Sequence, residues 1–470
     1  MRRARASNAG RVVVIVALTL LAVAAVRDFA RLGDALPWRQ LYDFSDFYCA
    51  GSALDARADP YRYESLRRCE HRVNTGEAYR RDPRRVVPAP LPPYDFPPFM
   101  AAARLNFNLA RVLHAVAITV AVAACIFGLS LLSVPLDVAA LALLLPAGFV
   151  LLSAGQVVPF ALVALVYCGV ALAKGRPVVA GVLAALTLIE PHLGLPVVAA
   201  LLCCAPRARA ALLLSGAALA VTAFAVAGAG GVTEYLAKVL PAQAAAETGY
   251  AYQYSLTYLL SAAGLAPNLA LLAGEAWYAA MLVIGVWLGT RLARSIDAPE
   301  LLVYLPAALS IFGGPYVHMV NVAFAIPAAV VLATRLRGPA RDLALVAVAL
   351  LAVPWIAAWI AKKLFLASVF VVAVLLVRLR AGLTLAIALP CMIALTLYVF
   401  GLAPPAPMVA TTTRSFAPDE LAQAAWADYV AALPKPDLGW LLIKLPTWLG
   451  LTGILAAALM TLRPNPRSAE

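Results

Sequence analysis

Residues 109–132, LARVLHAVAITVAVAACIFGLSLL, are almost entirely apolar and decide the fold of this chain. A helix of about 17 to 25 apolar residues is long enough to cross a hydrocarbon core of about 30 Å. Similar runs recur along the chain, and the alternating patterns typical of membrane strands are absent. We therefore expect an all-α polytopic membrane protein with about 11 to 14 transmembrane helices.

The composition indicates that a bilayer is the solvent. Charged residues make up 13% of the chain and hydrophobic residues 63%, whereas about 25% of the residues of a soluble domain are charged. The formal charge of +13 comes from short clusters between apolar runs, which is typical of cytoplasmic loops. We expect membrane lipids and no nucleic acid as partners, a single transmembrane domain over residues 1–470, and both termini in the cytoplasm. The clusters are Arg2 to Arg11, Lys174 and Arg176, Arg207 and Arg209, Arg291 and Arg294, Arg335 to Arg341, Arg378 and Arg380, and Arg463 and Arg467.

One long polar stretch interrupts the apolar runs near the start of the chain. It follows a first span near 12–28, interpreted as a retained signal anchor, with a cleaved signal peptide as the alternative. The stretch forms an extracytoplasmic loop at 29–108 that includes a short interfacial helix in FMAAARLNFN. Loops of this length are uncommon unless they are functional. Further extracytoplasmic loops are expected at 230–266 and 403–439. In the last one, Leu421, Ala425, Tyr429 and Leu433 have helical spacing and predict a helix on the membrane surface.

The remaining apolar runs give the predicted spans. Half-helices or re-entrant segments are expected near Glu190 and Gly313, where short runs are interrupted. The spans are predicted near 109–132, 137–153, 157–173, 177–189, 193–206, 209–229, 267–290, 299–313, 318–334, 342–360, 364–378, 382–402 and 440–462.

Asp43 and Asp46 are the residues of the first loop with the clearest chemical potential. In a helix they would share a face, because they are three positions apart. A carboxylate near the bilayer surface is placed to take a proton from a lipid-embedded substrate, and a second carboxylate can orient it. The alternative is an acidic loop in water whose charge the neighbouring arginines balance.

Of the seven cysteines, Cys49 and Cys69 lie in the first loop. In an oxidising exterior they could form a disulfide that closes a loop of about 20 residues and stabilises the fold by about 3 kcal/mol. The sequence leaves this pairing open. The chain has no nucleotide-binding glycine motif and no metal-ligand spacing, so we expect no cofactor and no metal site.

Several motifs, taken in order, resemble glycosyltransferase family 87, which comprises multi-pass enzymes of the GT-C fold. DFSDFYCAG at 43–51 and ADPY at 58–61 are similar to the signature that follows the family's first span. FPPF at 96–99 resembles the start of its interfacial helix. The segment from AGQ at 154–156 to EPHLGLP at 190–196 looks like its GQ, basic turn and KP succession, and GGPYVHMVN at 313–321 looks like its SPY and His segment. The resemblance covers residues 43–321 and is weaker beyond.

This resemblance implies a hexosyltransferase with a GT-C-like helix bundle. Such an enzyme moves a sugar, typically mannose, from a polyprenyl-phosphate donor to a lipid or glycan acceptor at the outer leaflet or in the periplasm, with inversion at the anomeric carbon. It would be a multi-pass protein of the bacterial plasma (inner) membrane with an extracytoplasmic active site.

The resemblance also implies roles for individual residues. Asp43 is the expected general base, His318 is expected near the donor phosphate or sugar, and Gln156 near a sugar hydroxyl. The rest of the expected substrate-binding set is Asp46, Tyr48, Glu190, His192 and Tyr316. A leaving phosphate needs positive charge, which one or two arginines of the first loop would supply. The candidates are Arg57, Arg62, Arg67, Arg68, Arg72, Arg80, Arg81, Arg84 and Arg85.

Three positions depart from the family pattern. Glu190 stands where the family has Lys, Val158 where it has Asn, and Gly314 where it has Ser. Glu190 and His192 would put an acid and an imidazole in place of an ammonium. The identity of the sugar and the contact with the phosphate therefore stay open.

Two other function classes also stay open. A transporter or flippase of lipid-linked or small polar solutes would use buried charges and broken helices near the midplane. A structural or assembly protein would need neither Asp43 nor His318. Few charges lie deep in the predicted spans and the richest polar segment is outside them, which favours chemistry at the outer surface.

Overall fold

Helices form almost all of the described chain. The computed structural model describes residues 41–382 apart from 75, 76 and 361, residues 410–434 and 438–463, and the isolated positions 16, 19, 20, 23, 390, 391 and 394. These residues contain no strand, only two isolated bridges. The predicted spans at 12–28 and 382–402 lie mostly outside the described residues.

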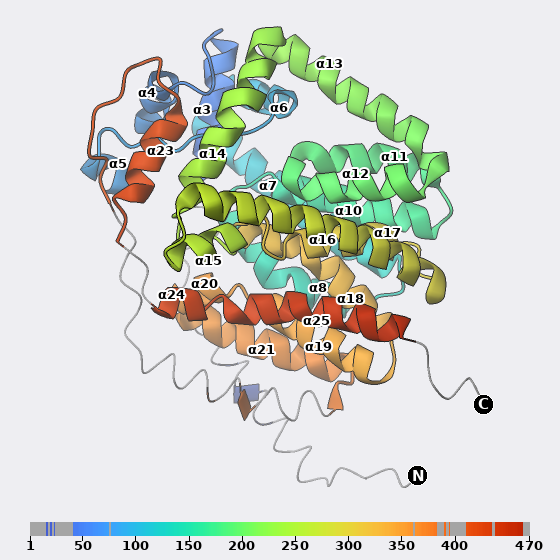
Figure 1. The fold of residues 1–470 in the computed structure, drawn as a ribbon. Helices are drawn as coiled ribbons and strands as arrows, with labels where there is room; N and C mark the ends of the chain where they lie inside the picture. Colours follow the sequence, from blue (N-terminus) through green and yellow to red (C-terminus); the bar gives the residue numbers. More distant parts are fainter. Residues whose placement is uncertain are drawn as a thin grey trace, which may run out of the picture.

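The apolar runs of the sequence form a bundle of long and short helices (Figure 1). Within the described chain, five segments are long and apolar enough to cross a membrane: α7 (Phe107–Ser130); α8 (Leu136–Leu143) with η3 (Leu144–Leu151) and α9 (Leu152–Ala154); α13 (Arg209–Glu234) and its continuation to Glu247; α16 (Pro267–Ser295); and α24 (Leu438–Leu442) with α25 (Leu445–Leu462). Shorter helices pack among them: α10 (Val158–Ala173), α11 (Pro177–Leu186), α12 (Pro191–Cys204), α17 (Leu301–Ser310), α18 (Ile326–Arg335), α19 (Gly338–Leu351), α20 (Trp355–Ile360) and α21 (Lys362–Arg378). This is the make-up of an all-α membrane protein.

Prolines set many of the helix boundaries. The helices α11, α12 and α16 each begin at a proline, which fits the first turn because no hydrogen bond from its nitrogen is needed there. One predicted span is wrong because of a proline. The single span expected at 342–360 is divided into α19 and α20, because Pro354 lies between them and cannot continue a helix.

The helix connections gather at two ends of the bundle. At one end, which we call the basic end, the Arg335 guanidinium lies 3.5 Å from the Leu132 carbonyl oxygen and 3.4 Å from a Glu300 carboxylate oxygen, and Arg378 pairs with Asp137. The connections at this end are residues 131–135, 174–176, 205–208, 296–300, 336–337 and 379–381. The connections at 155–157, 190 and 311–318 meet the first loop at the other end, which we call the loop end.

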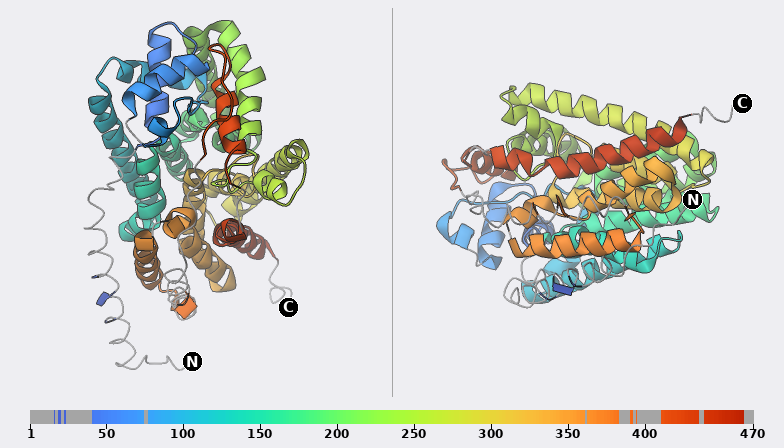
Figure 2. Two further views of the ribbon diagram at one scale, coloured as in Figure 1. Left: turned by 90° about the vertical axis from the view of Figure 1, so that its left-hand side faces the viewer. Right: turned by 90° about the horizontal axis from the view of Figure 1, so that it is seen from below.

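The loop end carries a layer of short helices, at the left in Figure 1 and facing the viewer in the left panel of Figure 2. They are α3 (Phe44–Asp55), α4 (Tyr63–Val73), α5 (Glu77–Arg81), α6 (Phe96–Ala103), α14 (Leu240–Glu247), α15 (Leu256–Ala262) and α23 (Ala422–Ala431). A disulfide between Cys49 and Cys69 joins α3 to α4, with the Cα atoms 5.5 Å apart. Ala425 and Tyr429 of α23 are buried. This helix therefore packs its apolar face on α14 and α4, and not on the membrane surface as predicted.

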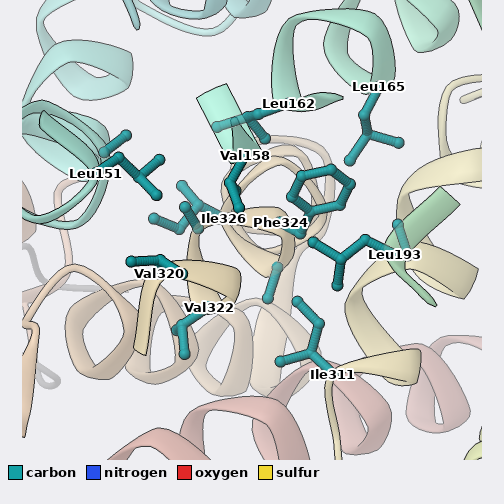
Figure 3. Close-up of a cluster of buried hydrophobic side chains, with 14 of the residues drawn as sticks. Leu151, Val158, Leu162, Leu165, Leu193, Ile311, Val320, Val322, Phe324 and Ile326 are labelled. Atoms are coloured by element: carbon teal, nitrogen blue, oxygen red, sulfur yellow. The ribbon is translucent and has the colours of Figure 1, made fainter. Parts of the chain in front are cut away.

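Directly beneath the loop end lies a cluster of buried aliphatic and aromatic side chains (Figure 3). Leu151 and Val158 flank the 155–157 connection, Leu193 follows the turn at Glu190, and Val320 follows the 311–318 connection. Burying a side chain of this size stabilises the fold by about 1.5–3 kcal/mol. The cluster thus holds three separate connections of the loop end in fixed positions relative to each other.

Candidate functional site

Asp43 is placed by a close contact between the first loop and the end of α9. Its backbone N–H donates to the Ala154 carbonyl at 2.7 Å. Gly155 ends α9 with a φ of 74°, and a Cβ at this position would lie 3.1 Å from both Leu41 Cα and Phe44 Cβ. Only glycine fits such a conformation and such an approach without strain. As a result, Gln156 donates a hydrogen bond from Nε2 to Oδ2 of Asp43.

The Asp43 carboxyl is half-buried. Burial raises the pKa of Asp43 to about 6, while the hydrogen bond from Gln156 and the positive charge of His318 lower it and the charge of Glu247 raises it. A carboxylate with a pKa close to the ambient pH is suited to take up and release a proton. Of the residues expected at the site, Gln156 therefore contacts Asp43 directly, and the charge of His318 acts on it.

His318 lies over a buried carboxylate. Its Nε2 is 3.7 Å from Oε2 of Glu247 and 3.2 Å from Nε2 of Gln253. The Gln253 side chain is fixed because its Oε1 accepts from the Val317 backbone N–H at 2.6 Å. Glu247 accepts hydrogen bonds from three neutral donors, Gln243 (3.0 Å), Gln253 (2.8 Å) and Trp426 (2.8 Å). The imidazole is therefore held beside the buried carboxyl group of Glu247 and remains 30% exposed.

Glu190, His192 and Tyr316 extend the site from His318 toward the first loop. Nδ1 of His192 lies 3.7 Å from Oε2 of Glu190. The ring of Tyr316 lies 4.7 Å from that of His192 and 6.1 Å from that of His318, measured between ring centres. The structure therefore brings these three residues together with His318.

Asp46 and Tyr48 have internal partners. The Tyr48 hydroxyl donates to the Leu105 carbonyl at 2.9 Å, and the Ser45 hydroxyl donates to Asp46 at 3.0 Å. Asp46 is buried near Glu70 of α4, and burial and the charges of Glu70 and Asp43 raise the pKa of Asp46 well above its usual value. Their observed contacts are those of residues that support α3. The prediction that they bind substrate stays a prediction.

Arg85 is an arginine of the first loop that lies among buried aromatic and acidic residues of the loop end. Its guanidinium lies 4.4 Å from the ring centre of Tyr429 and 5.6 Å from that of Tyr79, and its charge acts on Asp46 and Glu70. Its Nε has no protein partner. Other candidates are engaged elsewhere: Arg62 with Asp59 and Glu234, Arg67 and Arg68 with Glu64, and Arg84 with the Thr412 carbonyl.

An apolar groove of about 400 Å³ adjoins the site. It is connected to the His318 segment through Tyr254, whose backbone N–H donates to the Val317 carbonyl at 2.6 Å. Lys444 is buried at the start of α25 and donates to the carbonyls of Ala251 (2.5 Å) and Gln253 (2.6 Å). The groove is lined by Tyr254, Leu256, Trp277, Phe312, Leu445 and Trp448.

Sequence reasoning missed Glu247, Gln253 and Lys444. One signal could have found Lys444, because an ionisable residue inside the apolar stretch LGWLLIKLPTWLGL is a candidate for function. The polar segment TGYAYQYSL contains Gln253, but nothing in its pattern indicates contact with His318, 65 residues away.

The arrangement combines three chemical capacities. A carboxyl group can exchange a proton, a histidine and an arginine can attract an anion, and an apolar groove can hold a hydrocarbon chain. The described residues contain no group of three or more His, Cys, Asp or Glu side chains placed to hold a metal ion. Comparisons with protein-family models, curated proteins and solved structures found no match to this chain.

Proposed function

We propose that this chain is a membrane glycosyltransferase that moves a hexose from a polyprenyl-phosphate donor to an acceptor hydroxyl at the outer face of the membrane. The observation that carries the proposal is that Asp43 is hydrogen-bonded to Gln156 and feels the charge of His318, whose segment adjoins an apolar groove. The resemblance to glycosyltransferase family 87 in the DFSDFYCAG and GGPYVHMVN segments supports the same activity and a GT-C-like bundle of about 11 to 14 spans. It also makes mannose the first sugar to test.

Asp43 is the general base in this mechanism. Its carboxylate takes the proton of the acceptor hydroxyl while that oxygen attacks the anomeric carbon of the donor sugar. The bond between the anomeric carbon and the phosphate oxygen breaks, and the configuration at the anomeric carbon inverts. Polyprenyl phosphate leaves with the bonding electron pair. Gln156 orients the carboxylate through its hydrogen bond to Oδ2.

In this proposal the donor phosphate binds at His318, and Arg85 is the arginine of the first loop proposed to assist it. Preorganised positive charge stabilises the negative charge that develops on a leaving phosphate. The polyprenyl chain lies in the apolar groove, where Leu445, Leu449 and Trp277 are exposed on the outside of the bundle. A lipid could therefore enter from the side without leaving the membrane.

The distribution of charge supports the orientation. Lys174, Arg176, Arg207 and Arg209 lie at the basic end, which faces the cytoplasm by the usual excess of positive residues on that side. The loop end then faces the periplasm. The proposed location is the bacterial plasma (inner) membrane, with both termini cytoplasmic and the active site outside.

The proposal is tested by sugar transfer with the purified chain in nanodiscs. Several polyprenyl-phosphate hexoses are supplied together with lipid and glycan acceptors from membrane extracts. Asp43→Asn should lower the transfer rate by about 10²- to 10⁴-fold while donor binding persists. The wild-type rate should rise with pH with a midpoint near 6, because Asp43 accepts a proton only when it is ionised.

Asp55→Asn is the matched control on the same helix. Asp55 pairs with Arg104 at the surface, so this variant should keep the wild-type rate. A fully active Asp43→Asn would remove Asp43 as the base. Absence of transfer with every donor would favour the alternative, a transporter or flippase, which movement of a labelled lipid-linked sugar across the bilayer would then reveal.

A further inference from the structure

Asp95 carries a buried carboxyl oxygen without a partner. The residue is 8% exposed and immediately precedes α6. Its side chain does not cap that helix, and its Oδ2 has no hydrogen-bond partner in the protein. A buried polar atom left unpaired costs about 1–3 kcal/mol, so its persistence points to a partner that the chain itself does not provide.

Glu190 lies close enough to Asp95 for its charge to act on that carboxyl group. It occupies the turn between η4 (Thr187–Ile189) and α12, and the Tyr94 hydroxyl holds this turn by donating to the Leu188 carbonyl at 2.7 Å. The charge of Glu190, after burial, raises the pKa of Asp95. Among the described residues, neither carboxyl is paired with a lysine or an arginine. Two acids therefore lie in the same buried region without a lysine or arginine partner.

This pair continues the line of site residues away from the groove. His192 lies 3.7 Å from Glu190, and its ring adjoins that of Tyr316, which in turn adjoins that of His318. A donor whose lipid occupies the groove and whose phosphate lies at His318 would extend its sugar toward Tyr316 and Glu190. The acids are then placed to contact the side of the sugar that faces away from the phosphate.

We infer that Asp95 and Glu190 bind hydroxyl groups of the transferred sugar and so determine which sugar the chain accepts. This inference rests on the proposed function. A protonated carboxyl both donates and accepts a hydrogen bond, as a sugar hydroxyl does. The Tyr316 ring offers an apolar face on which a sugar ring can pack.

Hydroxyl groups fit this pair better than a cation does. Burial raises the pKa of Glu190 to about 8 and that of Asp95 well above its usual value, so both groups are largely neutral at pH 7. A metal ion or an ammonium would have to ionise them first. In addition, no metal-binding group of three ligands occurs among the described residues.

The experiment is a mutant-by-donor cycle. Glu190→Ala and Asp95→Leu remove the hydrogen-bonding groups, whereas Glu190→Gln and Asp95→Asn retain them. Each is assayed with the accepted hexose donor and with donors that lack one hydroxyl at a time. Glu190→Ala should lower kcat/KM for the full sugar about tenfold and have almost no effect on one of the deoxy donors. The conservative variants should recover most of the loss.

The inference is supported if the effect of Glu190→Ala on kcat/KM disappears with one particular deoxy donor and persists with the others. A loss of equal size with every deoxy donor would overturn it, and so would a wild-type preference for a donor with an amine in place of a hydroxyl. Both results require that the wild type transfers sugar, so either one leaves the proposed function intact. If the wild type transfers no sugar, the proposed function fails first. Asp55→Asn again serves as the control that should change no donor preference.

Discussion

The carboxyl groups of single residues differ sharply in their surroundings at the loop end. Burial raises the pKa of Glu70 to about 8, although the Val87 N–H and the Tyr79 hydroxyl both donate to it. Six residues earlier on the same helix, Arg67 and Arg68 lower the pKa of Glu64 to about 2. Two glutamates of the same helix, α4, therefore contribute to stability with opposite dependence on pH.

The wild type should lose stability as the pH rises, because Glu70 becomes ionised while buried. Glu70→Gln should not show this loss. The folded-state pKa of Glu70 lies above its unfolded value, so its contribution is complete below about pH 4.5 and is lost as the pH rises through about 8. The total loss is on the order of 5 kcal/mol. Thermal unfolding in detergent at pH 5 and pH 9 should show the variant close to the wild type at pH 5 and more stable at pH 9.

Glu64→Gln provides the control with the opposite sign. The pKa of Glu64 is lowered, so its contribution is present above about pH 4.5 and is lost as the pH falls through about 2. This variant should be no more stable than the wild type at pH 9. Equal responses of Glu70→Gln and Glu64→Gln to pH would show that Glu70 is not held in a neutral, buried state.

Among the structural elements, the junction of α9 with the first loop decides whether Asp43 contacts Gln156. Gly155→Ala would strain a backbone with a φ of 74° and place a methyl group 3.1 Å from Leu41 and Phe44. The strain costs about 1–2 kcal/mol, and relief of the contact would move Asp43 away from Gln156. We expect the transfer rate to fall at least tenfold, measured beside the melting temperature.

Gly175→Ala separates the effect of backbone strain from the effect of displacing Asp43. Gly175 also has a positive φ, 65°, but a Cβ there would meet nothing within 4 Å. It lies in the connection between α10 and α11 at the basic end. This variant should lose similar stability through backbone strain and keep its transfer rate. A comparable loss of rate in both variants would mean that backbone strain, and not the displacement of Asp43, explains the effect.

The sequence predicts an element well when the pattern that indicates it is local in the chain. Apolar runs and prolines are local, so the predicted span at 109–132 closely matches α7, and the one at 157–173 matches α10. The Asp43, Gln156 and His318 set came from motif resemblance, not from local pattern. Glu247 and Gln253 escaped prediction because their role depends on packing between segments far apart in sequence. The burial of Asp95 is likewise visible only in three dimensions.

The two ends of the helix bundle carry different kinds of side chains. The loop end carries the half-buried and buried carboxyl groups, the disulfide and the apolar groove. The basic end carries Lys and Arg side chains that pair with few acids. Exposed leucines and valines on α7, α13 and α16 occupy the surface between the ends. A bilayer around this surface would separate the two ends into two compartments.

The orientation can be tested with Ser415→Cys at the loop end and Ser295→Cys at the basic end, in a chain whose exposed Cys203 and Cys391 are replaced by Ser. Both serines are exposed, and the substitutions are nearly isosteric. An impermeant maleimide added to intact cells should label Ser415→Cys, and should label Ser295→Cys only after permeabilisation, because positive residues remain on the cytoplasmic side. The reverse pattern would place Asp43 in the cytoplasm and exclude an outer-leaflet acceptor. Labelling of both positions in intact cells would contradict a bilayer between the two ends.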